Sequence, residues 1–469
     1  MRNATITFLT LLQIIVLTSA LTAQDPDTVS VSLQEFIDLG LERSGKIKME
    51  KTEIDLAENK IVKSKSLKFL PEAKIETQHG LVPGVESDSI LPNGQPLPDG
   101  QLYLDPNLDN NLNDLNLFTR GEISAIQPIF GWGAINNAIA AAKAGAKAAE
   151  FNFSAEKEKF KLQLYKLYYS YLLSMELERL VEEAQNAINN IDKKLAKMEE
   201  EGDPDLDISD YYKFKIFRAQ FKTKIAEVAE GKKLVENTWN WMLKNDGQII
   251  YIPDKKFLDP VADSLQTLPY YRQKALAARY ELNAIDATIQ AANLGVSAAE
   301  AQNLPMLFLG LSVSGAFTPN RPRQTNPFIR NRSNFFGAAF GFGIRQNLNY
   351  FSIKSNIQKN KIQYRQSKHL RESAVEGIIL QINRSYKDAT VAKQRMQNNQ
   401  EALKISKQWE RQEQVDYDLG FGEPKDLLEA IRAKLELEVK VKEDMYQFNL
   451  NMARLYNASG IFVEELQMN

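Results

Sequence analysis

The sequence predicts an α+β membrane protein, in which long antiparallel coiled-coil helical hairpins are combined with a few β-strands per protomer. Three observations predict this class. Short runs alternate apolar and polar residues with the period of a strand. Long polar stretches carry apolar residues every seven positions, as coiled coils do. The whole layout occurs twice along the 469 residues, which indicates two internal repeats.

The composition excludes several classes of protein. A formal net charge of −2 gives no sign of a nucleic-acid partner. Cysteine is absent, so the chain has no disulfide and no thiolate metal site, and its two histidines are too few for a histidine-rich metal cluster. We find no nucleophile–base pair, phosphate-binding glycine loop or metal-ligand spacing. We therefore expect no enzyme, with no catalytic, cofactor-binding or metal-binding residues and no cofactor.

The N-terminus has the pattern of a secretory signal peptide over residues 1–23. Arg2 supplies the positive charge, residues 8–21 are apolar, and small residues, Ala20 and Ala23, precede a cleavage site. The alternative is a buried N-terminal helix. No other segment has the 18 or so continuous apolar residues of a spanning helix. A mature chain that crosses a membrane would therefore need a closed β-barrel, because only that structure pairs its backbone in lipid.

Two copies of one unit follow the signal peptide. Ser-Leu-Gln occurs at 32–34 and again at 264–266, and Leu-Pro closes a helical stretch at 70–71 and at 304–305. We assign repeat one to 24–247 and repeat two to 264–469. Each repeat has the order helix, two strands and long helical hairpin. The segment 248–263 links the repeats and carries two prolines without a helical period.

The strands are expected at about 71–80, 118–129, 305–317 and 335–348. In the last of them, Phe336, Ala338, Phe340, Phe342 and Ile344 share one face, and glycine and alanine dominate the other. These lengths suit tilted membrane-spanning strands of about 9–11 residues. A strand pair packed on a soluble core is the alternative, because alternation alone is a weak signal.

The helices are too long for a compact domain. Nine positions spaced seven apart run from Ile139 to Leu195, and all but Ser174 are apolar. A helix of roughly 65–70 residues extends on the order of 100 Å. Each long helix then turns back, at 199–210 and at 417–426. Gly202 and Gly420 suit the left-handed residue that ends a helix.

The order of these motifs resembles the TolC-like outer membrane efflux proteins over essentially the whole mature chain. The second turn carries the family pattern at 417–420 (YDLG) and 426–430 (DLLEA), and the strand-to-helix stretch 127–133 (QPIFGWG) is similar to the family junction. Phe421 and Gly422 stand where relatives often carry an arginine. The resemblance implies a homotrimer, in which each protomer gives four strands to one outer-membrane β-barrel and its helices to one periplasmic α-barrel.

Two groups of candidate site residues follow from the resemblance. Asp426 and Glu429 match family positions that line the periplasmic mouth, and three residues apart they share one helix face. Asp207 has an alternative role as a helix N-cap. The candidates for the periplasmic tip are Tyr417, Gly420, Asp426, Glu429, Gly202, Asp203, Asp207 and Asp210. The candidates for the strand–helix junction are Pro71, Pro128, Gly131, Trp132, Gly133 and Pro305.

Trp132 is expected at the lipid–water interface, where an amphipathic indole is favoured, and its alternative is a core residue. The glycines beside it permit the sharp change from strand to helix.

These expectations define a function. The resemblance implies a passive exit duct of a tripartite efflux or type I secretion system in the outer membrane of a Gram-negative bacterium, with its helical part in the periplasm. Its partners would be outer-membrane lipid, a periplasmic adaptor (membrane fusion) protein and an inner-membrane RND or ABC pump. The alternative is an exported coiled-coil tether without channel activity.

Overall fold

The computed structural model describes residues 27–85, 95, 101–102, 110–202, 207–245, 249–262, 265–319, 323–324, 332–419 and 421–461. The predicted signal peptide, Asp203 and Gly420 lie outside these residues. The chain divides into two compact units. Unit 1 takes its residues from Met1–Glu50, Ser154–Tyr280 and Val375–Asn469, and unit 2 from Lys51–Phe153 and Glu281–Ala374. Each unit therefore draws on both halves of the sequence.

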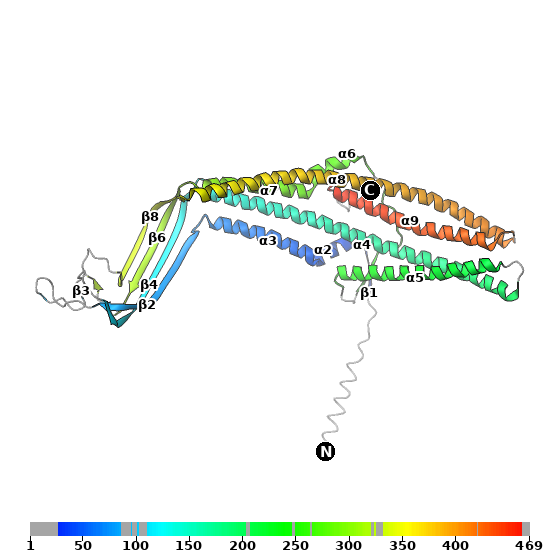
Figure 1. The fold of residues 1–469 in the computed structure, drawn as a ribbon, viewed down its shortest axis with the longest axis horizontal. Helices are drawn as coiled ribbons and strands as arrows, with labels where there is room; N and C mark the ends of the chain where they lie inside the picture. The colour runs from blue at the N-terminus through cyan, green and yellow to red at the C-terminus, as the bar shows by residue number, and fades with distance from the viewer. Residues whose placement is uncertain are drawn as a thin grey trace, which may run out of the picture. The chain divides into compact units, whose positions relative to one another are not determined.

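Unit 2 contains one antiparallel sheet of four strands, in the order β2-β4-β6-β8 (Figure 1). The strands are β2 (Glu72–Val85), β4 (Asn110–Phe130), β6 (Met306–Phe317) and β8 (Phe335–Arg345). The first two are longer than the sequence predicted. Two short strands, β3 (Gln101–Leu102) and β7 (Arg323–Gln324), pair separately and in parallel. The order of the four long strands brings the two halves of the sequence together between β4 and β6.

The two faces of this sheet differ in chemistry. The register places Ile75 opposite Ile123, Ile123 opposite Val313, and Leu311 opposite Phe340, so apolar residues align across all four strands. Phe340 is 85% exposed on this face. Polar or small residues align on the other face, among them Lys74, Glu76, Glu122, Ser124, Ser312 and Ser314. The predicted alternation is therefore present along the strands, and the apolar face is exposed.

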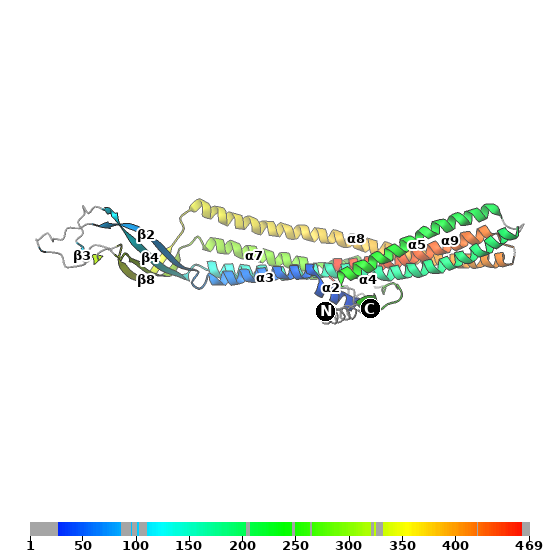
Figure 2. The same cartoon turned by 90° about the horizontal axis from the view of Figure 1, so that it is seen from below.

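Four helix ends meet one end of the sheet (Figures 1 and 2). Helix α3 (Gly45–Ser66) precedes β2, and α7 (Tyr280–Ala301) precedes β6. Helix α4 (Ala134–Glu201) follows β4, and α8 (Tyr350–Asp418) follows β8. Because neighbouring strands run antiparallel, the starts of β2 and β6 lie beside the ends of β4 and β8.

Unit 1 consists mainly of helices. Figure 2 shows the later part of α4 beside α5 (Ile208–Met242), and the later part of α8 beside α9 (Pro424–Ala458). Two shorter helices, α2 (Leu33–Arg43) and α6 (Leu268–Ala278), complete the set. Along α4, many of the predicted seven-residue positions are buried, namely Phe160, Ser174, Val181, Ile188 and Leu195 in unit 1 and Ala146 in unit 2. None of the helices in the described part of the chain is long and apolar enough to cross a membrane.

An aromatic cluster forms the core of unit 1 around α2. Phe36 stacks on Trp239 with 3.9 Å between ring centroids, and Tyr168 lies against both rings. Ser32 caps α2 in a capping box with Glu35. The adjacent strand β1 (Asp27–Val31) pairs in parallel with β5 (Ile249–Pro253). The sequence analysis assigned no strand to either segment.

Candidate functional site

The first turn of the predicted tip joins α4 to α5. Gly202 follows the last residue of α4 with φ of +65°, which agrees with the left-handed conformation expected there. Asp207 is the N-cap of α5, and its carboxylate accepts a 2.7 Å hydrogen bond from the Ser209 amide. The alternative role of Asp207 is therefore confirmed. Asp210 lies in the first helical turn and forms a 2.8 Å ion pair with Lys213.

The second turn joins α8 to α9. The carbonyl of Asp416 accepts hydrogen bonds from the amides of Phe421 and Gly422, both at 2.9 Å. A Cβ atom on Gly422 would lie 2.8 Å from the Tyr417 backbone nitrogen, closer than real Cβ atoms approach. Glycine is therefore required at 422, a position that the sequence analysis noted only for its missing arginine. Glu423 is the N-cap of α9, and Pro424 occupies its first turn.

A cavity of about 540 Å³ lies between these helices. It brings together four of the predicted tip residues, Asp207, Asp210, Tyr417 and Glu429. Asp426 does not line it. Basic residues also line the cavity, namely Lys194, Lys213, Lys425 and Arg432. The site is therefore of mixed charge rather than uniformly acidic.

Two ion pairs join these bases to acidic residues of the turns. The side chain of Lys194 in α4 lies 3.7 Å from the Asp418 carboxylate in α8 and 5.6 Å from the centre of the Tyr417 ring. The hydrogen bond and charge of Asp210, with smaller contributions from Asp207 and Glu429, raise the pKa of Lys213. Lys194 and Lys213 lie in helical turns outside the two predicted turn segments, 199–210 and 417–426.

Apolar contacts also connect α4 and α5 with α9 in unit 1. Ile188, Leu195, Tyr211 and Phe214 of α4 and α5 form a buried cluster, and Leu428 of α9 packs against it. Lys194 therefore links α4 to α8 by charge, and Leu428 links α9 to α4 and α5 by packing. Sequence reasoning found the turns but identified neither contact, because both join segments more than 200 residues apart.

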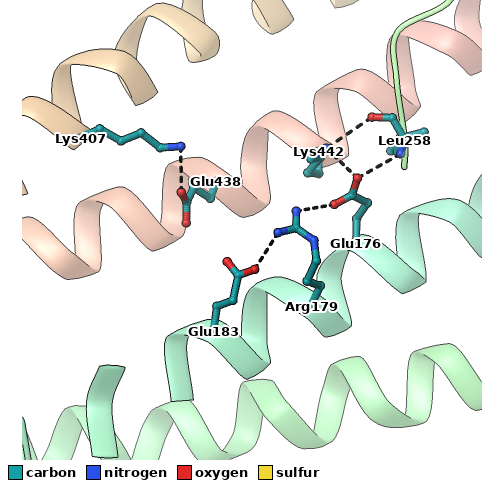
Figure 3. A network of polar contacts seen from close by, with 7 residues as sticks. All are labelled: Glu176, Arg179, Glu183, Leu258, Lys407, Glu438 and Lys442. Atoms are coloured by element: carbon teal, nitrogen blue, oxygen red, sulfur yellow. Dashed lines mark hydrogen bonds and ion pairs between the residues drawn. The ribbon is translucent and has the colours of Figure 1, made fainter. Parts of the chain in front are cut away.

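A buried carboxylate fixes the segment that follows β5 (Figure 3). Glu176 of α4 is 1% exposed and accepts hydrogen bonds from the Leu258 amide at 3.0 Å and from Lys442 of α9 at 2.8 Å. Arg179 donates a third at 2.8 Å and also binds the exposed Glu183. Burial alone would raise the pKa of Glu176, but these hydrogen bonds together hold it below its ordinary value.

Two further side chains hold the same segment. Asn449 of α9 is fully buried, accepts from the Val261 amide and donates to the Asp259 carbonyl, both at 2.8 Å. The Tyr168 hydroxyl donates to Asp254 at 2.5 Å. Residues 254–261 are therefore bound to α4 and α9 by polar side chains that the sequence analysis did not identify.

The predicted junction residues lie together at the helical end of the sheet in unit 2. Trp132 itself has φ of +54°, followed by Gly133 at +86°, so these two residues carry the change from β4 to α4. The indole nitrogen of Trp132 donates to the Pro305 carbonyl at 2.9 Å, and the residue is 52% exposed. The Trp132 and Phe130 rings form a T-shaped pair with 5.1 Å between their centroids.

Gln127 completes the junction. Its side-chain oxygen accepts from the Leu70 amide, and its side-chain nitrogen donates to the Lys68 carbonyl, both at 2.9 Å. These bonds tie the residues before Pro71 to the end of β4. Pro128 pairs with Phe308 beside a bulge, and Gly131 accepts through its carbonyl from the Ala134 amide at 2.9 Å. In the described residues, no cluster of three or more possible metal ligands occurs.

Comparison with known proteins identifies the fold. No protein-family model matches the chain, and no curated protein matches it by sequence. Crystal structures of CusC, which follow folding and transmembrane channel formation, match with a TM-score of 0.70 and 15% identity over 94% of this chain and 96% of that one. The outer membrane protein VceC of Vibrio cholerae matches with a TM-score of 0.68 and 15% identity over 92% and 96%.

The open state of the MtrE outer membrane channel of Neisseria gonorrhoeae gives a TM-score of 0.69 and 15% identity, over 94% of this chain and 95% of that one. The chain therefore has the fold of these outer-membrane channels along nearly its whole length. The TolC-like fold predicted from the resemblance is confirmed.

Proposed function

We propose that the chain is one protomer of a passive exit duct in the outer membrane. The observation that carries this proposal is the sheet of unit 2, which has one exposed apolar face and one polar face. A strand wall with lipid on one side and water on the other needs this alternation. The likeness to solved outer-membrane channels supports the same conclusion.

The sheet needs further chains to close. Among the described strands, none pairs with the outer edge of β2 or of β8. Unpaired backbone groups in lipid cost several kcal/mol each, and spanning barrels begin at about eight strands. Four strands per chain therefore require an oligomer. The number three comes from the resemblance and gives a homotrimer with one shared β-barrel.

The helices would form the periplasmic part of the duct. Helices α4 and α8 have 68 and 69 residues, and each is followed by a 35-residue helix that runs back. We infer two internal repeats and two coiled-coil hairpins per chain, which together build an α-barrel. The similar element order in the two halves and the burial of the seven-residue positions support this inference.

Substrates would pass through this duct from a periplasmic adaptor protein and an inner-membrane RND or ABC pump, in a tripartite efflux or type I secretion system. The channel itself would be passive, without catalysis. Its gate would lie at the tip, where Asp426 and Glu429 would form acidic rings. No described base forms an ion pair with either carboxylate, in contrast to Asp210 and Asp418.

The exposed sheet argues against the alternative of a soluble tether. Phe336, Phe340 and Phe342 of β8 are each more than 75% exposed on one face. Soluble proteins rarely expose a contiguous apolar patch of this kind, and such patches mark membrane or protein contacts.

The proposal is tested by extraction from outer membranes and sedimentation in detergent. We expect a homotrimer that conducts ions in planar bilayers, and a stable monomer without conductance would contradict it. Phe340→Lys should reduce membrane insertion, since a lysine on the lipid face costs about 2–4 kcal/mol near the midplane. Ala339→Lys, on the opposite face of β8, is the matched control and should insert normally. Equal insertion of the two variants would count against a membrane-spanning sheet.

A further inference from the structure

Basic residues gather at the helical end of the sheet. We define the lysine band as the lysines in the helical turns nearest the strands, namely Lys60, Lys63, Lys65, Lys68, Lys143, Lys147, Lys354 and Lys359. No acidic residue occurs within 59–71, 134–149 or 350–371. The chain as a whole has a net charge of −2, so this excess of positive charge is local.

A cavity of about 740 Å³ lies within the lysine band. Lys65, in the last turn of α3, and Lys68, two residues beyond its end, face it together with Lys143 of α4. Phe69, Asn136 and Ile139 add an aromatic ring, an amide and an aliphatic side chain to its lining. None of the lining residues is acidic. Glu300 of α7 lies at the same end of the helices, but its ion pair is with Lys361 rather than with any of the three lysines. The cavity therefore presents concentrated positive charge beside apolar surface.

Aromatic side chains occur at the same end of the sheet. Phe69 is 74% exposed, Trp132 is 52% exposed, and Tyr350 and Phe351 are exposed at the start of α8. Aromatic rings favour the membrane–water interface, and lysines next to a membrane favour anionic headgroups. The aromatic rings and the lysine band therefore each indicate a membrane–water interface at the helical end of the sheet.

We propose that the cavity formed by Lys65, Lys68 and Lys143 binds the phosphate headgroup of an anionic phospholipid, with Phe69 against the adjoining apolar part of that lipid. This inference rests on the proposed function, in which the sheet spans the outer membrane and its helical end meets the periplasmic leaflet. The lysines supply the charge that recognises the phosphodiester, and the apolar lining distinguishes a lipid from free phosphate.

Native mass spectrometry of the full-length protein in detergent tests this inference. Phosphatidylglycerol, phosphatidylcholine and inorganic phosphate are the probes. Each lysine near an anionic surface contributes about a fivefold gain in affinity, so replacing all three with glutamine should weaken phosphatidylglycerol binding on the order of 100-fold. The matched control replaces Lys193, Lys222 and Lys404, exposed lysines of unit 1, and should change binding less than twofold.

The expected result is stronger binding of phosphatidylglycerol than of phosphatidylcholine, lost in Lys65→Gln/Lys68→Gln/Lys143→Gln and kept in the control. Equal binding of the two lipids by the wild-type protein would overturn the inference, as would displacement of phosphatidylglycerol by millimolar phosphate. Conductance in planar bilayers tests the proposed function separately. A conducting wild-type channel with no preference for the anionic lipid would therefore refute the lipid site alone.

Discussion

Removal of the buried carboxylate of Glu176 should loosen the segment that follows β5. Glu176→Ala takes the acceptor away from the Leu258 amide, which is fully buried, and from Lys442, whose side chain is only 20% exposed. Leaving a buried amide without a partner costs about 1–3 kcal/mol. Breaking a buried ion pair costs about 3–5 kcal/mol, and partial exposure of Lys442 reduces this. We expect a local loss of about 3–5 kcal/mol.

Hydrogen–deuterium exchange at the Leu258 amide measures this loss directly. Each 1.4 kcal/mol changes an equilibrium about tenfold, so the amide should exchange at least 100-fold faster in Glu176→Ala. Glu183→Gln is the matched control, because Glu183 also binds Arg179 but is exposed, where such pairs contribute about 0.2–1 kcal/mol. Unchanged exchange in Glu176→Ala, or equal effects of the two variants, would refute this reasoning.

The same network makes stability dependent on pH. The pKa of Glu176 in the folded chain is below its ordinary value, so the unfolded chain binds the proton more readily. The contribution of Glu176 is complete above its ordinary pKa and is lost as the pH falls through the lower, folded pKa. The protection of the Leu258 amide against hydrogen–deuterium exchange, corrected for the intrinsic exchange rate, should therefore decline in acid. In Glu176→Ala this decline should be smaller.

Three further predictions concern the tip. The double variant Asp426→Asn/Glu429→Gln should show weaker cation selectivity in single-channel recordings, and multivalent cations should block it less. The control is Asp210→Asn, whose carboxylate is already paired with a lysine, and it should change both properties less. Unaltered selectivity in the double variant would show that these carboxylates do not face the pore. Gly422→Val should destabilise the second turn by about 1–3 kcal/mol, because the added side chain would overlap the Tyr417 backbone. The variant should still insert into the membrane but no longer export substrate, and normal export would contradict this. Lys194→Gln removes a link between the hairpins and should raise conductance, and an unchanged channel would show that this link does not restrain the tip.

Much of the fold was predictable because its signals are local. The alternation in β8 and the seven-residue spacing of α4 are each visible within one segment, and both elements occur where expected. Strands β1 and β5 were missed because they have five residues each and pair in parallel across more than 200 positions. Such a pairing leaves no periodic signal in either segment. Parallel partners also lack the short hairpin turn that reveals antiparallel neighbours.

The site was only partly predictable for the same reason. The turn glycine Gly202 and the N-cap Asp207 follow from local backbone chemistry, and both were identified from sequence. The partners of the tip carboxylates were not, since Lys194 and Asp418 meet only after α4 and α8 pack together. Glu176 was missed because a single glutamate in a charged helix gives no sign of burial. Its partner Lys442 lies 266 residues away.

Cysteine labelling of the sheet in membranes tests the central claim most directly. The chain contains no cysteine, so single substitutions can be labelled without background. Ala339 and Phe340 are neighbours in β8 whose side chains point to opposite faces of the sheet. A water-soluble maleimide should modify Ala339→Cys in the aqueous lumen and leave Phe340→Cys unmodified in lipid until the protein is denatured. Equal and rapid labelling of both variants in intact membranes would contradict the account of a membrane-spanning barrel.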